Sequence, residues 1–152
     1  MPKPRVLLAH DDADCRKIYG SMLEIAGYDV VMSDHGDRAL GLLSSAAFDI
    51  LITDLYLRSV EDECLLRRVR RRGGWSHLPV VVLTGWTTDP HRTLARDEGA
   101  DVYLPLPVGP RQLLAAVNRL LAGGSTRAPI SPGTASREDP RDHPILPGVL
   151  GL

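Results

Sequence analysis

The sequence has little cysteine, little net charge and no long apolar run. Two of its 152 residues are cysteine, and its formal net charge is −1. Two cysteines cannot form a disulfide framework, and a nearly neutral chain has no overall field that attracts nucleic acid or a membrane surface. No stretch approaches the roughly 20 apolar residues that span a bilayer. These absences exclude a disulfide-rich or membrane-spanning protein and argue against nucleic acid and membrane as partners.

The composition that is present is typical of one globular domain. Hydrophobic residues make up 43% of the chain and charged residues 24%, which allows a buried core. We interpret Cys15 and Cys64 as reduced thiols buried on helices. The N-terminal residues turn acidic after a very short apolar run, which argues against a signal peptide. We therefore expect a cytoplasmic location.

Strand-like and helix-like segments alternate along the chain. Each short apolar run is followed by a segment with helical spacing of its apolar residues. Strands joined by helices run parallel, and a parallel sheet is buried on both faces, so its strands need not alternate apolar and polar residues. The order predicts a doubly wound three-layer α/β domain. The predicted strands are 5–9, 28–33, 48–53, 78–84 and 101–106, and the predicted helices are 12–26, 36–47, 61–72, 89–98 and 109–123.

Residues 124–152 differ in composition from the rest of the chain. They are rich in proline, glycine and serine and show neither helical nor strand periodicity. We predict one domain at 1–123 and a disordered or loosely packed tail at 124–152, with no output domain. The tail ends in an apolar stretch, 143–152, which we interpret as having no role. The alternative is a peptide that docks on a partner or on the domain itself.

Acidic and hydroxyl side chains stand at the ends of several predicted strands. Asp11 follows the first strand, Asp54 follows the third, and Thr84 ends the fourth. Ligands of open parallel sheets bind beyond the carboxyl ends of the strands, so these side chains should share one pocket. Neighbouring carboxylates need a cation, here Mg²⁺, and a carboxylate beside a hydroxyl and a divalent cation can accept a phosphoryl group. A lone aspartate at such a place usually caps a helix, which is our interpretation of Asp12 and Asp14.

Four stretches of the sequence resemble the receiver domains of bacterial two-component response regulators, the CheY-like family. "VLLAHDDAD" resembles the first strand and acidic cluster of that family, and "DILITDLYL" resembles the strand before the phospho-acceptor aspartate. "LPVVVLTG" and "GADVYLPLP" resemble the strands that carry the switch hydroxyl and the switch aromatic residue. The resemblance runs from Arg5 to about Ala122 and implies the flavodoxin-like strand order 2-1-3-4-5.

The resemblance implies a role for each matching residue. Asp54 would accept a phosphoryl group from a phosphohistidine of a sensor histidine kinase or phosphotransfer protein. Mg²⁺ would be bound by Asp11, Asp54 and the backbone carbonyl of Tyr56. Thr84 and Tyr103 would switch position after phosphorylation. The surface of the last two helices and the fifth strand would then change its preference for an unknown downstream protein, and it could also form a homodimer.

Three positions depart from the pattern of that family. The first residue of the usual acidic pair is His10, and a neutral imidazole is a poor Mg²⁺ ligand, so we expect reduced affinity unless Asp12 helps through water. The usual switch lysine is Leu106, which cannot hydrogen-bond a phosphoryl oxygen. The usual proline and glycine after the acceptor are Arg58 and Asp62, so this loop should differ in shape.

Two further expectations concern these departures. A protonated His10 is a conceivable substitute for the absent lysine, although a solvated histidine is the simpler interpretation. The Leu106–Pro107 peptide is expected to be cis, as the corresponding bond is in the family.

The matches and the departures support two functional hypotheses from different classes. In the first, the chain is a non-enzymatic single-domain receiver in a phosphorelay, with weakened switching. In the second, it is a pseudo-receiver that binds proteins without phosphorylation. A haloacid-dehalogenase-like phosphatase needs a second acid two residues after the nucleophile, where Tyr56 stands, and a flavin site needs a phosphate-binding loop after the first strand. Both are disfavoured.

Other conspicuous residues have simpler interpretations. We interpret the basic run 67–75 as a solvated helix face whose charges suit the helix macrodipole. Trp86 could cover the acidic pocket, face a partner or pack over a loop. The remaining histidines show no metal-ligand spacing. Leu104 and Arg111 lie near the surface proposed for a homodimer.

Overall fold

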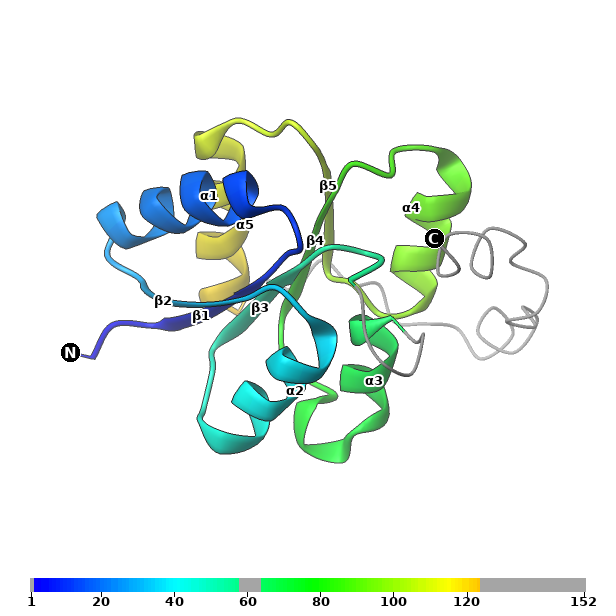
Figure 1. Cartoon of the computed structure of the whole chain (residues 1–152), viewed down its shortest axis with the longest axis horizontal. Helices are drawn as coiled ribbons and strands as arrows, with labels where there is room; N and C mark the ends of the chain where they lie inside the picture. The colour runs from blue at the N-terminus through cyan, green and yellow to red at the C-terminus, as the bar shows by residue number, and fades with distance from the viewer. Residues whose placement is uncertain (1, 58–63, 124–152) are drawn as a thin grey trace.

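The structure, a computed structural model, describes residues 2–57 and 64–123. Five parallel strands form one sheet in the order β2-β1-β3-β4-β5, with helices on both faces (Figure 1). This arrangement confirms the predicted flavodoxin-like fold. Its elements are β1 (Arg5–Ala9), α1 (Ala13–Ile25), β2 (Asp29–Ser33), α2 (Gly36–Ser45), β3 (Ile50–Thr53), α3 (Leu65–Arg71), η1 (Gly73–Trp75), β4 (Val80–Thr84), α4 (Asp89–Asp97), β5 (Val102–Pro105) and α5 (Pro110–Leu121).

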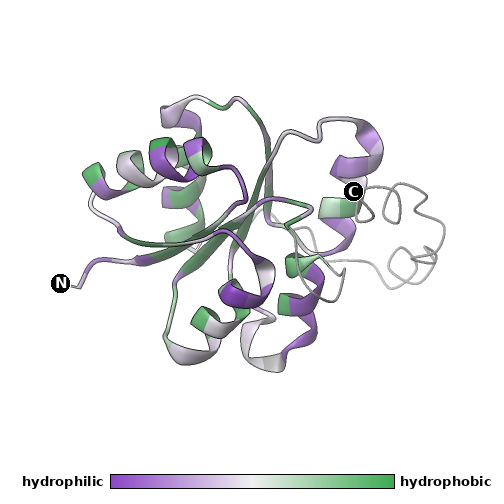
Figure 2. Ribbon diagram, viewed as in Figure 1, coloured by the Kyte–Doolittle hydropathy of each residue, from purple (hydrophilic) through white to green (hydrophobic). Residues whose placement is uncertain are grey.

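Apolar side chains on the two faces of the sheet form two cores. Successive residues of a strand point to opposite faces, so Val6 and Leu8 lie in one core and Leu7 in the other. The α1–α5 core contains side chains of α1 and α5, and the α2–α4 core contains side chains of α2, α3 and α4. Figure 2 shows the apolar colour running along the strands between these layers. Every residue of β4 is buried, which explains its uninterrupted apolar sequence.

The inward face of α1 differs from the predicted one. Apolar residues at helical spacing predicted this helix and its apolar stripe: Cys15, Ile18, Tyr19, Met22 and Ala26. Tyr19 is buried, together with Leu23 four residues further on, but Ile18 is 59% exposed, and Ala26 lies beyond the helix and is also exposed. The error has a physical cause: an apolar stripe read from sequence fixes the period of a helix but not its rotation to within one residue.

The basic run is only partly a solvated face, since Arg71 and Arg72 are exposed whereas Arg67 and Arg70 are half-buried. In α3, Arg67 donates two hydrogen bonds to the Glu98 carboxylate at 2.6 and 3.0 Å, and both side chains are less than one fifth exposed. Arg70 donates to the carbonyls of Gly99 and Leu78 and to the Asp101 carboxylate. These contacts connect α3 to the turn after α4 and to the start of β4. The sequence interpretation was wrong here because long arginine side chains reach partners that lie far away along the chain.

The two cysteines are free thiols. Cys64 is buried, as predicted, although it caps α3 and is not inside the helix. Cys15 lies on α1 and is half-buried. In 2–57 and 64–123, no helix combines the length and the apolar character needed to cross a membrane.

Candidate functional site

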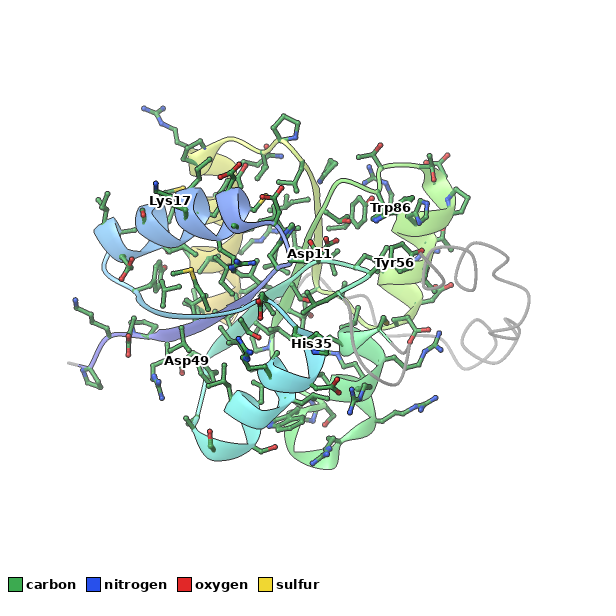
Figure 3. The ribbon with its side chains drawn as sticks, in the orientation of Figure 1. Asp11, Lys17, His35, Asp49, Tyr56 and Trp86 are labelled. Atoms are coloured by element: carbon green, nitrogen blue, oxygen red, sulfur yellow. The ribbon has the colours of Figure 1, made fainter. Side chains whose placement is uncertain are left out.

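The residues predicted to form a pocket do meet at one edge of the sheet. Ala9 of β1 pairs with Thr53 of β3, so the residues that follow these strands are neighbours. The backbone N–H of Asp54 donates to the carbonyl of Ala9 at 3.1 Å, which fixes the two strand ends together. Figure 3 labels Asp11 at this edge, with Tyr56 on the side toward α4.

His10 is buried and lies beside the Asp54 carboxylate. Its side chain is 3% exposed, and its Nε2 lies 3.6 Å from Oδ2 of Asp54 and 3.2 Å from the carbonyl oxygen of Leu83. Its Nδ1 accepts a hydrogen bond from the backbone N–H of Asp12 at 3.1 Å. The expectation of a solvated histidine is therefore wrong. The side chain is directed from the end of β1 across β3 toward β4, a direction that sequence cannot show.

Asp54 has a carboxylate oxygen without a partner. Its side chain is 11% exposed, and among the described residues its buried Oδ1 makes no hydrogen bond. Burial raises the pKa of this carboxyl above its ordinary value, and the charge of Asp11 raises it further. The nearby Thr84 side chain, the His10 ring and the Leu55 N–H act in the opposite direction, but none forms a full hydrogen bond with Oδ1. A buried oxygen in this condition is a suitable ligand for a cation.

A group of three side chains could hold that cation. His10, Asp11 and Asp54 each offer one ligand atom, and these atoms lie within 4.8 Å of one another. The unpartnered Oδ1 and the second carboxylate fit a divalent cation such as Mg²⁺, which prefers oxygen ligands. The contribution of the Tyr56 carbonyl stays a prediction, and Arg58 and Asp62 lie outside the described residues.

Asp12 caps α1, as one interpretation of its position predicted. Its Oδ1 accepts hydrogen bonds from the backbone N–H groups of Asp14 and Cys15 at 2.8 and 3.3 Å. Its help to a metal through water stays a prediction. The acids also act on the neighbouring thiol: burial, with the charges of Asp12 and Asp54, raises the pKa of Cys15 to about 11. The edge of the sheet therefore carries a strong negative potential.

The two residues predicted to switch, Thr84 and Tyr103, both contact the loop between β4 and α4. Thr84 is fully buried, and its hydroxyl accepts a hydrogen bond from the backbone N–H of Trp86 at 3.2 Å. The half-buried Tyr103 donates its hydroxyl hydrogen to the carbonyl of Trp86. The Arg92 guanidinium lies 4.9 Å from the centre of the Tyr103 ring. The two residues are therefore linked through one loop residue.

Three aromatic rings pack together beside the acids. The hydroxyl of Tyr56 lies 2.7 Å from Nδ1 of His91, and the Trp86 ring meets the Tyr56 ring edge to face at 5.5 Å. Trp86 also lies 5.0 Å from the His91 ring and remains 37% exposed. Burial raises the pKa of Tyr56 and lowers that of His91, so both are neutral. We call Tyr56, Trp86 and His91 the aromatic cluster. Metal-ligand spacing could not reveal His91, because its partner is 35 positions away.

Leu106 occupies the position of the usual lysine. Its backbone N–H donates to the carbonyl of Thr84 at 2.8 Å, and its side chain packs against the α1–α5 core. The Leu106–Pro107 peptide is cis, as predicted. This position therefore provides an apolar contact and no hydrogen-bond donor to the site.

Comparisons with known proteins identify the family. A model described as "Response regulator receiver domain" matches residues 6–118. The chain is 32% identical over 133 residues to the sensor histidine kinase TmoS of Ectopseudomonas mendocina, covering 85% of this chain and 14% of that protein. It is 30% identical over 117 residues to the transcriptional regulatory protein CpxR of Escherichia coli K12, covering 77% of this chain and 49% of CpxR. The chain thus spans about half or less of these relatives.

Solved structures show the same fold. The chemotaxis response regulator CheY4 of Vibrio cholerae is 26% identical with a TM-score of 0.71, covering 78% of this chain and 99% of CheY4. A putative response regulator of Chloroflexus aurantiacus is 28% identical with a TM-score of 0.73, covering 80% of this chain and 99% of its own. Together with the family model and the acids gathered at the sheet edge, these likenesses show that the chain belongs to the response regulator receiver domains of two-component signalling.

Proposed function

We propose that this chain accepts a phosphoryl group on Asp54 from the phosphohistidine of a sensor kinase or phosphotransfer protein. The observation that carries the proposal is the buried Oδ1 of Asp54, which makes no hydrogen bond to the residues that the structure describes. Asp11 is more than half exposed, so Asp54 is the carboxylate held inside the pocket. In the transfer, an oxygen of Asp54 forms a bond to phosphorus, and the P–N bond of the phosphohistidine breaks with its electron pair returning to that imidazole.

A bound divalent cation would supply positive charge to the phosphoryl oxygens. Asp11 and Asp54 would hold it, and the receiver domain of Pseudomonas aeruginosa PA1611 was solved with a magnesium ion in its active-site cleft. At 21% identity, that likeness shows only the shared fold. The support for a metal in this chain is the group of possible ligand atoms from His10, Asp11 and Asp54. Mg²⁺ is the cation we propose, with affinity reduced because an imidazole replaces one acid.

Switching is proposed to be weak. Leu106 has no charge that could attract the phosphoryl group. Phosphorylation therefore favours the switched conformation over the present one by a smaller free energy. Tyr103 is held by its hydrogen bond to Trp86 and by Arg92, and both contacts favour its present position. Phosphorylation would therefore produce only a small change on the surface of α4, β5 and α5, where a downstream protein or a second copy would bind.

A pseudo-receiver is the second candidate, favoured by the same apolar Leu106 and anchored Tyr103. Incubation with acetyl phosphate and Mg²⁺, followed by intact mass spectrometry, separates the two. We expect slow addition of one phosphoryl group, abolished by chelation of the metal and by Asp54→Asn. Complete absence of the added mass would favour the pseudo-receiver, and rapid stoichiometric addition would contradict weak phosphorylation.

A further inference from the structure

We infer that His10 gives the phosphoryl group the hydrogen-bond donor that Leu106 cannot give. The inference rests on the proposed phosphorylation of Asp54 and adds a binding role for a residue at a position where the family usually has an acid. The side chain is nearly fully buried, with Nε2 3.6 Å from the carboxylate that would carry the phosphoryl group. It is thus held inside the pocket and directed at the reacting group.

The hydrogen bonds of His10 assign its ring proton. The backbone N–H of Asp12 can only donate, so Nδ1 uses its lone pair as the acceptor. The carbonyl of Leu83 can only accept, so Nε2 carries the hydrogen. Both partners require the same neutral tautomer. The N–H of that tautomer lies on the side of the ring that faces Asp54.

Within 2–57 and 64–123, no basic side chain competes with His10 for the Asp54 carboxylate. Among the described residues, no lysine or arginine nitrogen lies within 4.0 Å of the Asp54 carboxylate. Arg16 is the arginine next to His10, and its guanidinium donates to the His10 carbonyl at 2.6 Å. Leu106 packs into the α1–α5 core. In the part of the chain that the structure describes, His10 is therefore the side-chain nitrogen donor nearest to the Asp54 carboxylate.

The distances also explain how the donor would be used. At 3.6 Å, Nε2 is beyond hydrogen-bond range of Oδ2, so its hydrogen is held by the Leu83 carbonyl at 3.2 Å. A phosphoryl oxygen on Asp54 would carry negative charge and would be a stronger acceptor than a carbonyl. The N–H would then turn from Leu83 to the phosphoryl oxygen. His10 gains and loses no proton in this step.

A role of His10 as a metal ligand is less consistent with these contacts. Nδ1 already accepts the Asp12 N–H and Nε2 already carries a hydrogen, so a cation would have to displace one of these two hydrogen bonds. The two roles make different predictions. A donor can be replaced by an amide N–H or by a nearby ammonium group, whereas a metal ligand needs a lone pair.

The test compares His10→Gln and His10→Leu with the wild-type full chain, using acetyl phosphate, Mg²⁺ and intact mass. One hydrogen bond to a charged group is worth roughly tenfold to a hundredfold. We expect uptake to fall by about that factor in His10→Leu and by much less in His10→Gln, which keeps an N–H donor. His35→Leu is the matched control: His35 also accepts a backbone N–H at Nδ1, but its ring lies beside the Asp37 carboxylate at the start of α2, so uptake by this variant should match the wild type.

Adding Leu106→Lys to His10→Leu should restore uptake, and the gain should exceed that of Leu106→Lys in the wild type. In the wild-type chain, Nε2 of His10 should keep its hydrogen when beryllofluoride binds, and its ¹⁵N resonance should shift. An unshifted Nε2 resonance, or wild-type uptake in His10→Leu, overturns the role of His10 alone. The donor role is also overturned, in favour of a metal ligand, if both His10 variants lose phosphoryl uptake equally, bind Mg²⁺ more weakly and are not rescued by Leu106→Lys. Absence of wild-type uptake overturns this role together with the proposed function.

Discussion

Asp54 occupies a position that is unfavourable for a carboxylate and useful for accepting a phosphoryl group. Its burial raises its pKa, which means that the ionised form destabilises the fold in the absence of a cation. A group whose pKa is raised on folding adds stability as the pH falls through that pKa. The buried carboxylate therefore lowers the stability of the metal-free protein at neutral pH, and it is the group that we propose as the phosphoryl acceptor.

Asp54→Asn should raise the melting temperature of the metal-free protein at neutral pH by several degrees, because the amide carries no charge. The difference from the wild type should shrink at acid pH, where the wild-type carboxyl is protonated, and on addition of Mg²⁺. Thermal unfolding followed by circular dichroism at several pH values measures both effects. A melting temperature unchanged or lowered at neutral pH would mean that the carboxylate is not destabilising.

Leu106→Lys should increase phosphoryl uptake, because its ammonium group would provide the charge missing from the pocket. The same change should lower the free energy of unfolding by about 1–3 kcal/mol, since Leu106 packs against the α1–α5 core. Uptake is read by intact mass and stability by urea unfolding. Leu106→Met is the matched control, which keeps the apolar contact, and it should leave uptake low. No gain with the lysine would count against the importance of the missing cation.

For individual residues, the sequence predicted that Asp11, Asp54 and Thr84 lie close together, because the carboxyl ends of parallel strands share one edge of the sheet. It could not predict that His10 is buried. The direction of a side chain depends on the neighbouring strands, and the Leu83 carbonyl that holds His10 lies 73 positions away along the chain.

The loop between β4 and α4 connects the pocket to the aromatic cluster. Trp86 contacts Thr84 and Tyr103 through its backbone and Tyr56 through its ring. A change in the pocket therefore reaches an exposed aromatic side chain through few contacts. The sequence left three interpretations of Trp86 open, namely that it covers the pocket, faces a partner or packs over a loop, and it did not predict the contacts with Tyr56 and His91.

Tyr56→Phe should remove the hydrogen bond to buried His91 and lower the free energy of unfolding by about 1–2 kcal/mol. Urea unfolding checks this value. Tyr28→Phe serves as the matched control, because the Tyr28 hydroxyl contacts Asn118 at an exposed position where water can replace it. If the two variants lose equal stability, the buried Tyr56–His91 hydrogen bond stabilises the fold no more than the exposed Tyr28–Asn118 contact does.

Arg70→Met should lower the free energy of unfolding by about 3–5 kcal/mol, because it removes the guanidinium that pairs with the buried Asp101 carboxylate and donates to the carbonyls of Gly99 and Leu78. The resulting loss of melting temperature should be much larger than that of Arg119→Met, whose side chain is exposed on α5. Calorimetry of the two variants compares them. A loss in Arg70→Met no larger than in Arg119→Met would restore the interpretation of this run as a solvated face.

Across the whole molecule, the fold follows from simple patterns and the site only in part. The apolar runs predicted the five strands of the sheet, because a parallel sheet between two helical layers buries both faces, and the resemblance to receiver domains implied the strand order. Element ends and helix rotation were less well predicted, as Ile18 shows, since they depend on tertiary packing. Among the described residues, the candidate metal-binding group of His10, Asp11 and Asp54 lies at the edge where β1, β3 and β4 end.

Phosphorylation mapped to a single residue tests this view most directly. The wild-type chain and Asp54→Asn are incubated with acetyl phosphate and Mg²⁺, digested, and analysed by mass spectrometry of the peptides. The expected result is one phosphoryl group, slowly added, on Asp54, dependent on the metal and absent from the variant. A phosphoryl group on another residue, equal labelling of Asp54→Asn, or no labelling at all would contradict the assignment of Asp54 as the acceptor.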